Sequence, residues 1–113
     1  MSVKNVIVEK SLDFGIKIVQ FCELLDERKK YVVARQLLRS GTSIGANVFE
    51  AQHAESKADF IHKMKIAIKE ASETVFWLCI CERSENYPAD SSLKQLTEEL
   101  IRIISSIIIS SKK

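Results

Sequence analysis

The stretch from Leu37 to Leu78, LLRSGTSIGANVFEAQHAESKADFIHKMKIAIKEASETVFWL, decides the fold of this chain. Its residues favour helices, and its small and polar residues recur at spacings of three and four, which places them on shared helix faces. A helix that only fills a core rarely needs so many small and polar positions. The segment therefore predicts two helices whose faces pack closely or make polar contacts.

The chain as a whole has the composition of one helical domain. Its 113 residues have room for a single core, and three glycines and one proline leave little to interrupt helices. We expect an all-α domain spanning residues 1–113.

Apolar periodicity predicts four helices. The first covers about residues 4–25, and the second follows a charged turn at 26–30 and ends near residue 53. The third starts at an N-cap on Ser56 and is broken at residues 86–88, and Asp90 or Ser91 caps the fourth. Short connections predict an antiparallel up-down-up-down bundle. The residues expected to face the core are Phe14, Ile18, Phe21 and Leu25, widened by Leu12, Ile16 and Val19; Ala34, Leu37, Leu38, Gly41, Ile44, Gly45 and Val48; Phe60, Met64, Ala67, Ala71, Val75 and Leu78; and Leu93, Leu96, Leu100, Ile103, Ile104 and Ile107.

More apolar residues are present than one bundle interior needs. A symmetric homo-oligomer would bury the excess. The residues assigned to this excess are Val6, Ile7, Phe49, Ile101, Ile108 and Ile109.

A polar ridge runs along the second helix, where Arg39, Ser43, Asn47 and Glu50 are spaced by four, four and three residues. The third helix carries Lys63, Glu70, Glu73 and Trp77 at comparable spacings, so Asn47 or Glu50 could reach Lys63. Half-buried polar groups need partners, which favours a network that orders a helix–helix or subunit interface. A ligand or nucleic-acid site on the same ridge is the alternative.

The segments SIGANVFEAQ and SKADFIHKMKIAIKEASETVFWL resemble the signature of the four-helix-bundle family related to proteins encoded in intervening sequences of bacterial 23S ribosomal RNA. The resemblance rests on a Ser-x-x-x-Asn-x-x-Glu pattern, a Ser-x-x-Asp-Phe start and a Glu-Ala-x-Glu-Thr-x-x-Trp-Leu run, in that order. Many members have Gly directly after the first glutamate, where this chain has Ala51. The residues that carry the motif here are Ser43, Asn47, Glu50, Asp59, Phe60, Glu70, Glu73 and Trp77.

The resemblance implies a ring-like homopentamer of such bundles. A related branch comprises the accessory proteins of diversity-generating retroelements, which are basic and pentameric and work with a reverse transcriptase and RNA. Most family members have no settled biochemical role. The resemblance thus implies a homo-oligomeric scaffold whose partner is RNA or a reverse-transcriptase-like protein.

The net charge of +2 is too small to require a nucleic-acid partner, but five copies would carry five times +2, or +10. Acidic residues are interspersed with the basic ones, so a solvated, mixed surface is the alternative. No aromatic platform for base stacking is expected, and Trp77 is assigned to an interface. The candidate nucleic-acid contacts are Arg28, Lys29, Lys30, Arg35, Arg39, Lys63, Lys65 and Lys69.

The main chemical alternative is a carboxylate–histidine metal site. Glu50-x-x-His53 has the spacing used on the helices of di-iron bundles, and Asp59-x-x-His62 repeats it after the turn. A metal-dependent bundle enzyme is therefore kept as one alternative function, and a purely structural oligomer as another. No Ser-His-Asp or Cys-His constellation fits this topology, and we expect no enzyme and no cofactor.

Other features indicate a soluble cytoplasmic protein. Cys22, Cys79 and Cys81 are odd in number and are expected to be buried, reduced thiols. The start of the chain lacks a signal peptide, and the apolar C-terminal run is too short to cross a membrane. The spacing of Gly41 and Gly45 within a helix predicts close helix approach.

Overall fold

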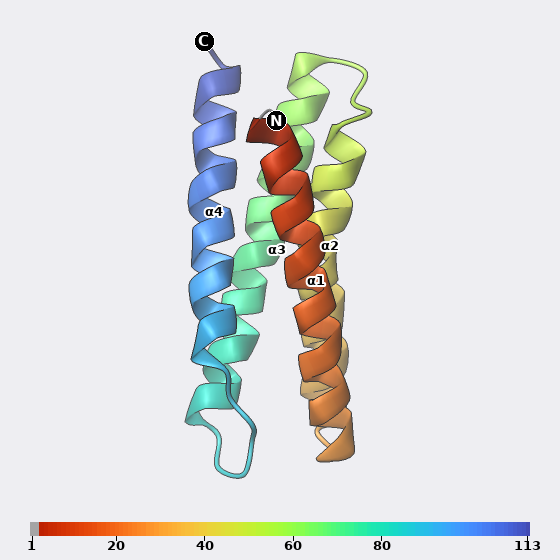
Figure 1. Ribbon diagram of the computed structural model, residues 1–113, viewed down its shortest axis with the longest axis vertical. Helices are drawn as coiled ribbons and strands as arrows, with labels where there is room; N and C mark the ends of the chain where they lie inside the picture. The colour runs from red at the N-terminus through yellow and green to blue at the C-terminus, as the bar shows by residue number, and fades with distance from the viewer. Residues whose placement is uncertain (1–2) are drawn as a thin grey trace.

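Four long helices make up the fold: α1 (Val3–Glu27), α2 (Tyr31–Ala51), α3 (Lys57–Arg83) and α4 (Ser91–Ser111). The computed structural model describes residues 3–113, with side chains from residue 6 onward. Each helix packs against the next, and α1 also packs against α4, whereas α1–α3 and α2–α4 make no close backbone approach within these residues. The molecule is therefore the predicted antiparallel up-down-up-down bundle, with extents of 47 × 23 × 20 Å (Figure 1).

The turns differ in detail from the prediction. Helix α1 continues to Glu27, so the first turn is shorter than expected, and Lys29 takes a left-handed φ of 62° within it. Helix α2 ends at Ala51, two residues before the predicted position. Gln52 follows with right-handed angles, φ −66° and ψ −18°, so the chain makes no left-handed turn after Ala51.

The predicted helix caps are confirmed. The Ser56 side chain accepts a hydrogen bond from the Asp59 amide at 3.0 Å, while the Asp59 carboxylate accepts one from the Glu55 amide at 3.2 Å. At α4, the Asp90 carboxylate accepts from the Ser92 amide at 2.9 Å. These bonds satisfy amides that the first turn of a helix leaves without helical partners, and so fix where α3 and α4 begin.

The core is filled by the predicted stripes, with some exceptions. Leu12, Ile16, Val19 and Leu38 are 45%, 50%, 41% and 40% exposed and do not belong to it. On α1 the three exposed residues lie 100° or more around the helix from the fully buried Ile18, too far to share its contacts. On α3, Thr74 is fully buried and Val75 only half-buried.

The excess apolar residues divide into two groups. Ile7 and Ile108 are buried within the single bundle, and Val6 and Ile101 are partly covered, so the prediction that they need a partner subunit is wrong for Ile7 and Ile108. Phe49 and Ile109 are exposed as predicted. Among residues 3–113, no helix is both long enough and apolar enough to span a membrane.

Candidate functional site

A polar network joins α2 to α3 along the ridge that the sequence indicated. Arg39 of α2 reaches both Glu70, at 3.3 Å, and Glu73 of α3. Glu73 also accepts a hydrogen bond from the indole nitrogen of Trp77 at 3.1 Å. The Arg39 guanidinium therefore pairs with two carboxylates of the family motif. One of them, Glu73, also fixes the orientation of the Trp77 indole.

Two further contacts join α2 to α3, one nearer the turn between them and one at the level of Arg39 and Glu73. Lys63 donates to Glu50 at 3.2 Å, which confirms one of the two predicted partners for this lysine. On the buried side, the Thr74 hydroxyl donates to Ser40 at 3.0 Å. Asn47 instead donates to the Ser43 carbonyl of its own helix at 2.8 Å, so its amide contributes to α2 rather than to α3.

The remaining motif residues have local structural positions. Ser43 donates to the Arg39 carbonyl at 2.6 Å, Asp59 completes the cap of α3, and Phe60 is buried in the core. The motif thus orders the α2–α3 half of the bundle, as the interface interpretation of the ridge requires within one chain. Its role at a subunit interface stays a prediction.

The two glycines of α2 allow α1 to approach closely. A Cβ added at Gly41 would lie 2.8 Å from a side-chain carbon of Ile18, and one at Gly45 would lie 3.2 Å from the Ser11 carbonyl oxygen. This geometry bears out the prediction of close helix approach, because side chains at these positions would displace α1.

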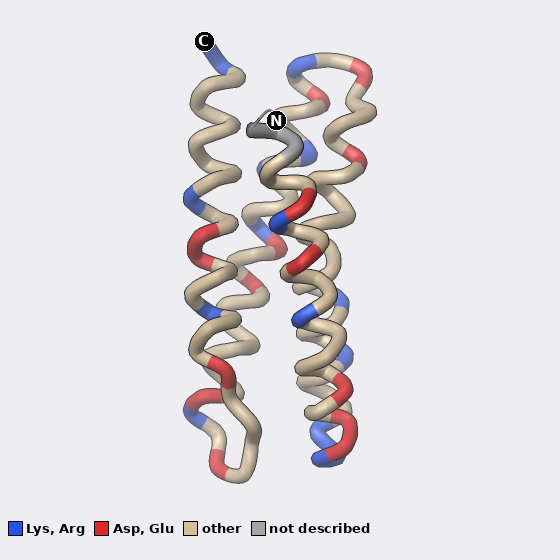
Figure 2. The backbone as a smooth tube through the Cα atoms, viewed as in Figure 1, with Lys and Arg blue, Asp and Glu red and all other residues tan. Residues whose placement is uncertain are grey.

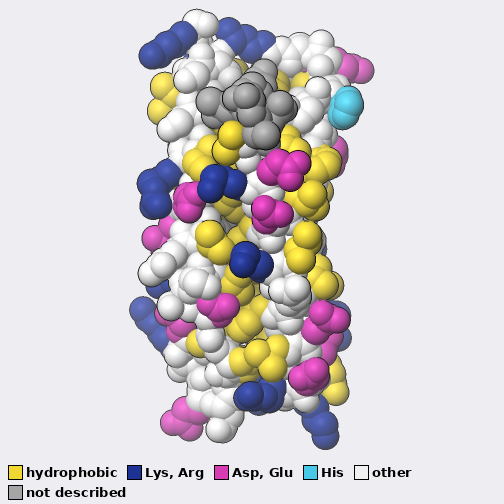
Figure 3. Space-filling view, in the orientation of Figure 1, with side chains coloured by type: hydrophobic (Ala, Val, Ile, Leu, Met, Phe, Trp, Pro, Cys, Tyr) yellow, Lys and Arg dark blue, Asp and Glu magenta, His cyan; other side chains and the backbone are white. Residues whose placement is uncertain are grey.

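An apolar groove opens on the outer side of the α1–α2 pair. It has a volume of about 350 Å³ and is bordered by the exposed side chains of Leu12, Ile16 and Phe49, with Gly15 and Ala46 between them. Figure 3 shows hydrophobic side chains reaching the surface beside α1, next to acidic ones. The sequence assigned Phe49 to a subunit contact but Leu12 and Ile16 to the core. The 3-4-3-4 spacing of Glu9, Leu12, Ile16, Val19 and Glu23 could have revealed this surface.

A second exposed apolar site, also missed, lies on α3. Phe76 is 55% exposed and borders a groove of about 320 Å³ with Cys79, Ile80 and Arg83. Its ring packs edge-on against Trp77, with ring centroids 5.1 Å apart and an interplanar angle of 77°. The polar network therefore also orients an exposed aromatic side chain, through Trp77.

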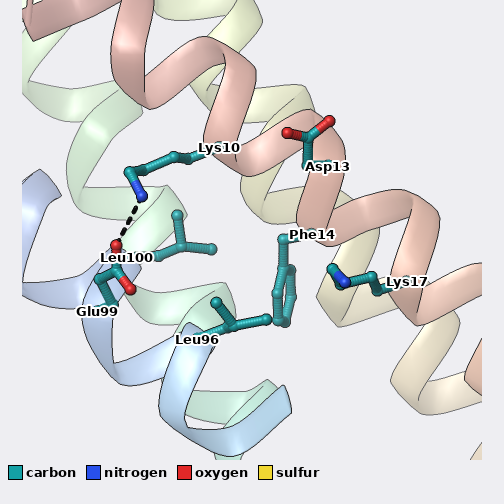
Figure 4. A pocket seen from close by; sticks show the side chains of 7 residues that line it. All are labelled: Lys10, Asp13, Phe14, Lys17, Leu96, Glu99 and Leu100. Atoms are coloured by element: carbon teal, nitrogen blue, oxygen red, sulfur yellow. Dashed lines mark hydrogen bonds and ion pairs between the residues drawn. The ribbon is translucent and has the colours of Figure 1, made fainter. Parts of the chain in front are cut away.

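A third groove, of about 180 Å³, separates α1 from α4 (Figure 4). Phe14, Leu96 and Leu100 line its floor, and Lys10 bridges it to Glu99 at 2.8 Å. The hydrogen bond and charge of Lys10 lower the pKa of the Glu99 carboxyl. The groove is closed at this point by an exposed ion pair.

The candidate metal ligands are not assembled into a site. Glu50 is bound to Lys63, and the Asp59 carboxylate accepts the Glu55 amide. Among the described residues, no group of three or more His, Cys, Asp or Glu side chains is placed to hold a metal ion. The two Glu/Asp-x-x-His pairs stay sequence patterns without a common centre.

The candidate nucleic-acid contacts divide into distinct groups. Arg28, Lys29 and Lys30 lie at the end of the bundle where α1 turns into α2 (Figure 2), and Lys30 lies 4.7 Å over the ring of Tyr87. Arg39 and Lys63 pair with carboxylates across α2 and α3. The exposed members of the set are Arg28, Lys29, Arg35, Arg39, Lys65 and Lys69.

The three cysteines are free thiols, and two of them are buried as expected, while Cys79 is half-buried. Burial raises the pKa of Cys22 to about 12 and that of Cys81 to about 11, and the nearby carboxylates of Asp26 and Glu82 respectively add to these shifts. Both buried thiols are protonated at neutral pH and are poor nucleophiles.

Comparisons with known proteins agree with this architecture. The family model described as 23S rRNA-intervening sequence protein matches residues 3–108. A solved structure, a protein of unknown function from the S23 ribosomal protein family of Bacteroides thetaiotaomicron VPI-5482, is 44% identical with a TM-score of 0.88; the match covers 95% of this chain and 98% of that one. No curated protein matches the chain.

Proposed function

We propose that this chain, which belongs to the 23S rRNA-intervening sequence protein family, is a non-enzymatic, homo-oligomeric scaffold that binds RNA. The assembly is a ring of five copies, and its repeated basic surfaces bind the phosphates of structured RNA. The proposal places the protein in the cytoplasm, where its three free thiols would stay reduced.

The observation that carries the assembly is the uncovered apolar groove on α1 and α2. Three large side chains, Leu12, Ile16 and Phe49, are each more than two-fifths exposed around one groove. Apolar groups gathered on one surface favour association, since burying them removes apolar area from water. A closed ring would cover this groove in every copy.

Native mass spectrometry and sedimentation at micromolar concentration test the assembly. We expect a pentamer for the wild-type chain and a shift to monomer for Ile16→Asp, because a carboxylate in the groove would have to lose its water on association. Gln95→Asp, which adds the same charge at an exposed position of α4 away from the groove, should leave the pentamer intact. A wild-type chain that is monomeric under these conditions contradicts the proposed assembly.

The RNA part of the proposal rests on the basic turn. Arg28 and Lys29 are exposed at one end of the bundle, and Arg35 is exposed one to two turns into α2. Arg39 and Lys63 already pair with carboxylates, which makes them weaker candidates for phosphate contact. A ring would repeat the turn and raise the local density of positive charge.

Binding of structured RNA should weaken as salt rises, because phosphate contacts release counterions. Reversing Arg28 and Lys29 to Glu should reduce affinity at least tenfold at low salt. Lys112→Glu with Lys113→Glu changes the net charge equally at the opposite end and should have a smaller effect. Absence of RNA binding at low salt, or binding that is insensitive to salt, would remove this part of the proposal and leave a protein partner as the alternative.

A further inference from the structure

The outer faces of α1 and α3 carry the same pattern with opposite charge. On α1, Glu9 and Glu23 flank the exposed Leu12, Ile16 and Val19; we call these five residues the acidic stripe. On α3, Lys69 and Arg83 flank Ser72, Phe76 and Cys79; we call these five the basic stripe. Both stripes follow a 3-4-3-4 spacing, so each lies along one helix face with its charged ends about 21 Å apart.

The two stripes belong to diagonal helices and cannot meet within one chain. Among the described residues, α1 and α3 make no close backbone approach, because α2 and α4 lie between them. Only a second molecule could therefore bring one stripe against the other. Their charges are complementary to each other, whereas either stripe against its own copy would oppose like charges.

We propose that the acidic stripe of one copy packs against the basic stripe of the next, with Phe76 entering the α1–α2 groove. This inference rests on the proposed assembly and identifies its interface. The contact is heterologous, since different surfaces of each copy are used. Repetition of such a contact gives a ring when the rotation between copies closes, as the proposed assembly requires, and an open filament when it does not.

Contacts within the bundle show that this pairing needs little axial shift. Between α1 and α2, Ser11 lies level with Gly45 and Ile18 with Gly41. Between α2 and α3, Ser40 contacts Thr74 and Glu50 contacts Lys63. At about 1.5 Å per residue, these contacts put Val19 near the level of Phe76. In a copy set alongside, Lys69 and Arg83 would each lie about one helical turn, or about 5 Å, from the level of Glu9 and Glu23.

Phe76 is already oriented for such a contact. Its ring makes a T-shaped contact with Trp77. The Trp77 indole nitrogen donates to Glu73, and Glu73 pairs with Arg39. Less side-chain freedom is lost when a supported aromatic residue docks than when a mobile one does. The family motif on α2 and α3 would thus act in assembly by orienting Phe76.

Charge reversal tests the pairing in the full chain. Glu9→Lys with Glu23→Lys, or Lys69→Glu with Arg83→Glu, should each raise the dissociation constant of the assembly at least tenfold, and all four changes together should largely restore it. Glu55→Lys with Glu98→Lys makes an equal charge change at exposed positions outside the stripes and should have little effect. Circular dichroism confirms that each variant is folded.

Cysteine cross-linking gives a second, independent test in a Cys79→Ser background. A chain with both Ile16→Cys and Phe76→Cys should form a ladder of covalent multimers on mild oxidation, and either change alone should form none. A covalent dimer from one single-cysteine variant would show like surfaces meeting and would overturn the inference.

The outcomes separate this inference from the proposed function. A wild-type oligomer that survives both reversals would overturn the stripe pairing and leave the assembly standing. A monomeric wild type would overturn both. If reversal of Lys69 and Arg83 abolished RNA binding and left the oligomer intact, the basic stripe would be an RNA surface and the pairing would be wrong.

Discussion

The contact between α2 and α3 differs in kind from the contact between α1 and α4. Across α2–α3, directional polar bonds join the helices at several levels: Lys63 to Glu50, Arg39 to Glu70 and Glu73, and the buried Thr74 to Ser40. Across α1–α4, the apolar floor of a groove lies below the Lys10–Glu99 ion pair. Hydrogen bonds depend on geometry and therefore fix the register of α2 and α3, whereas apolar burial is non-directional and tolerates small shifts.

The largest expected effect is a loss of stability, and it should be greater when a leucine is truncated in the enclosed core than when one is truncated beside the α1–α4 groove. Leu37→Ala should lower the free energy of unfolding by about 4 kcal/mol, because Leu37 is fully buried and its cavity cannot collapse easily. Leu100→Ala should cost about 2–3 kcal/mol, because Leu100 borders a groove that is already open to solvent. Urea unfolding followed by circular dichroism at one protein concentration measures both losses, and equal losses would contradict the distinction.

A smaller effect is expected from the buried hydroxyl between α2 and α3. Thr74→Val keeps the side-chain shape but removes two contacts, the one with Ser40 and the one with the Glu70 carbonyl of its own helix. Loss of the Ser40 contact should cost about 1 kcal/mol, because the Ser40 hydroxyl loses a buried partner. Thr97→Val is the matched control, since Thr97 is equally buried and donates to the Leu93 carbonyl of its own helix. If the control lost as much stability as Thr74→Val, the bond between the helices would contribute nothing measurable to the free energy of unfolding.

The smallest effect concerns the ion pair above the α1–α4 groove. Lys10 lowers the pKa of Glu99 in the folded chain, so the stabilisation is complete above the unfolded pKa of a glutamate, about 4.3, and is lost as the pH falls through the lower folded value. Both side chains are more than a third exposed, which limits the pair to less than about 1 kcal/mol.

Thermal unfolding between pH 3 and pH 7 measures this contribution. Lys10→Ala should lower Tm slightly at pH 7 and reduce the loss of Tm on acidification. Lys17→Ala, at the border of the same groove, should keep the wild-type acid dependence. An unchanged acid dependence in Lys10→Ala would show that the pair contributes nothing measurable.

Local chemistry explains which features the sequence could predict. The caps at Ser56 and Asp90 use side chains close in sequence to the amides they bind, so a short pattern specifies them. The pairing of Glu50 with Lys63 crosses one short turn between antiparallel helices and was equally accessible.

Features that depend on the angle between helices could not be predicted in this way. Leu12, Ile16 and Val19 have apolar spacings compatible with a wide buried stripe, and only the position of α2 beside α1 leaves them at the surface. Ile7 and Ile108 are the reverse case: the sequence assigned them to a subunit contact, but one bundle buries them. Their burial depends on how the ends of the bundle close.

The sequence by itself determined the all-α class, the four helices, their antiparallel order and the family, because periodicity, caps and short turns act over a few residues. The tertiary structure decided which apolar residues remain exposed and brought Arg39, Glu73 and Trp77 together behind Phe76. It also placed two stripes of opposite charge on diagonal helices, a relation between residues 60 positions apart that no local pattern contains.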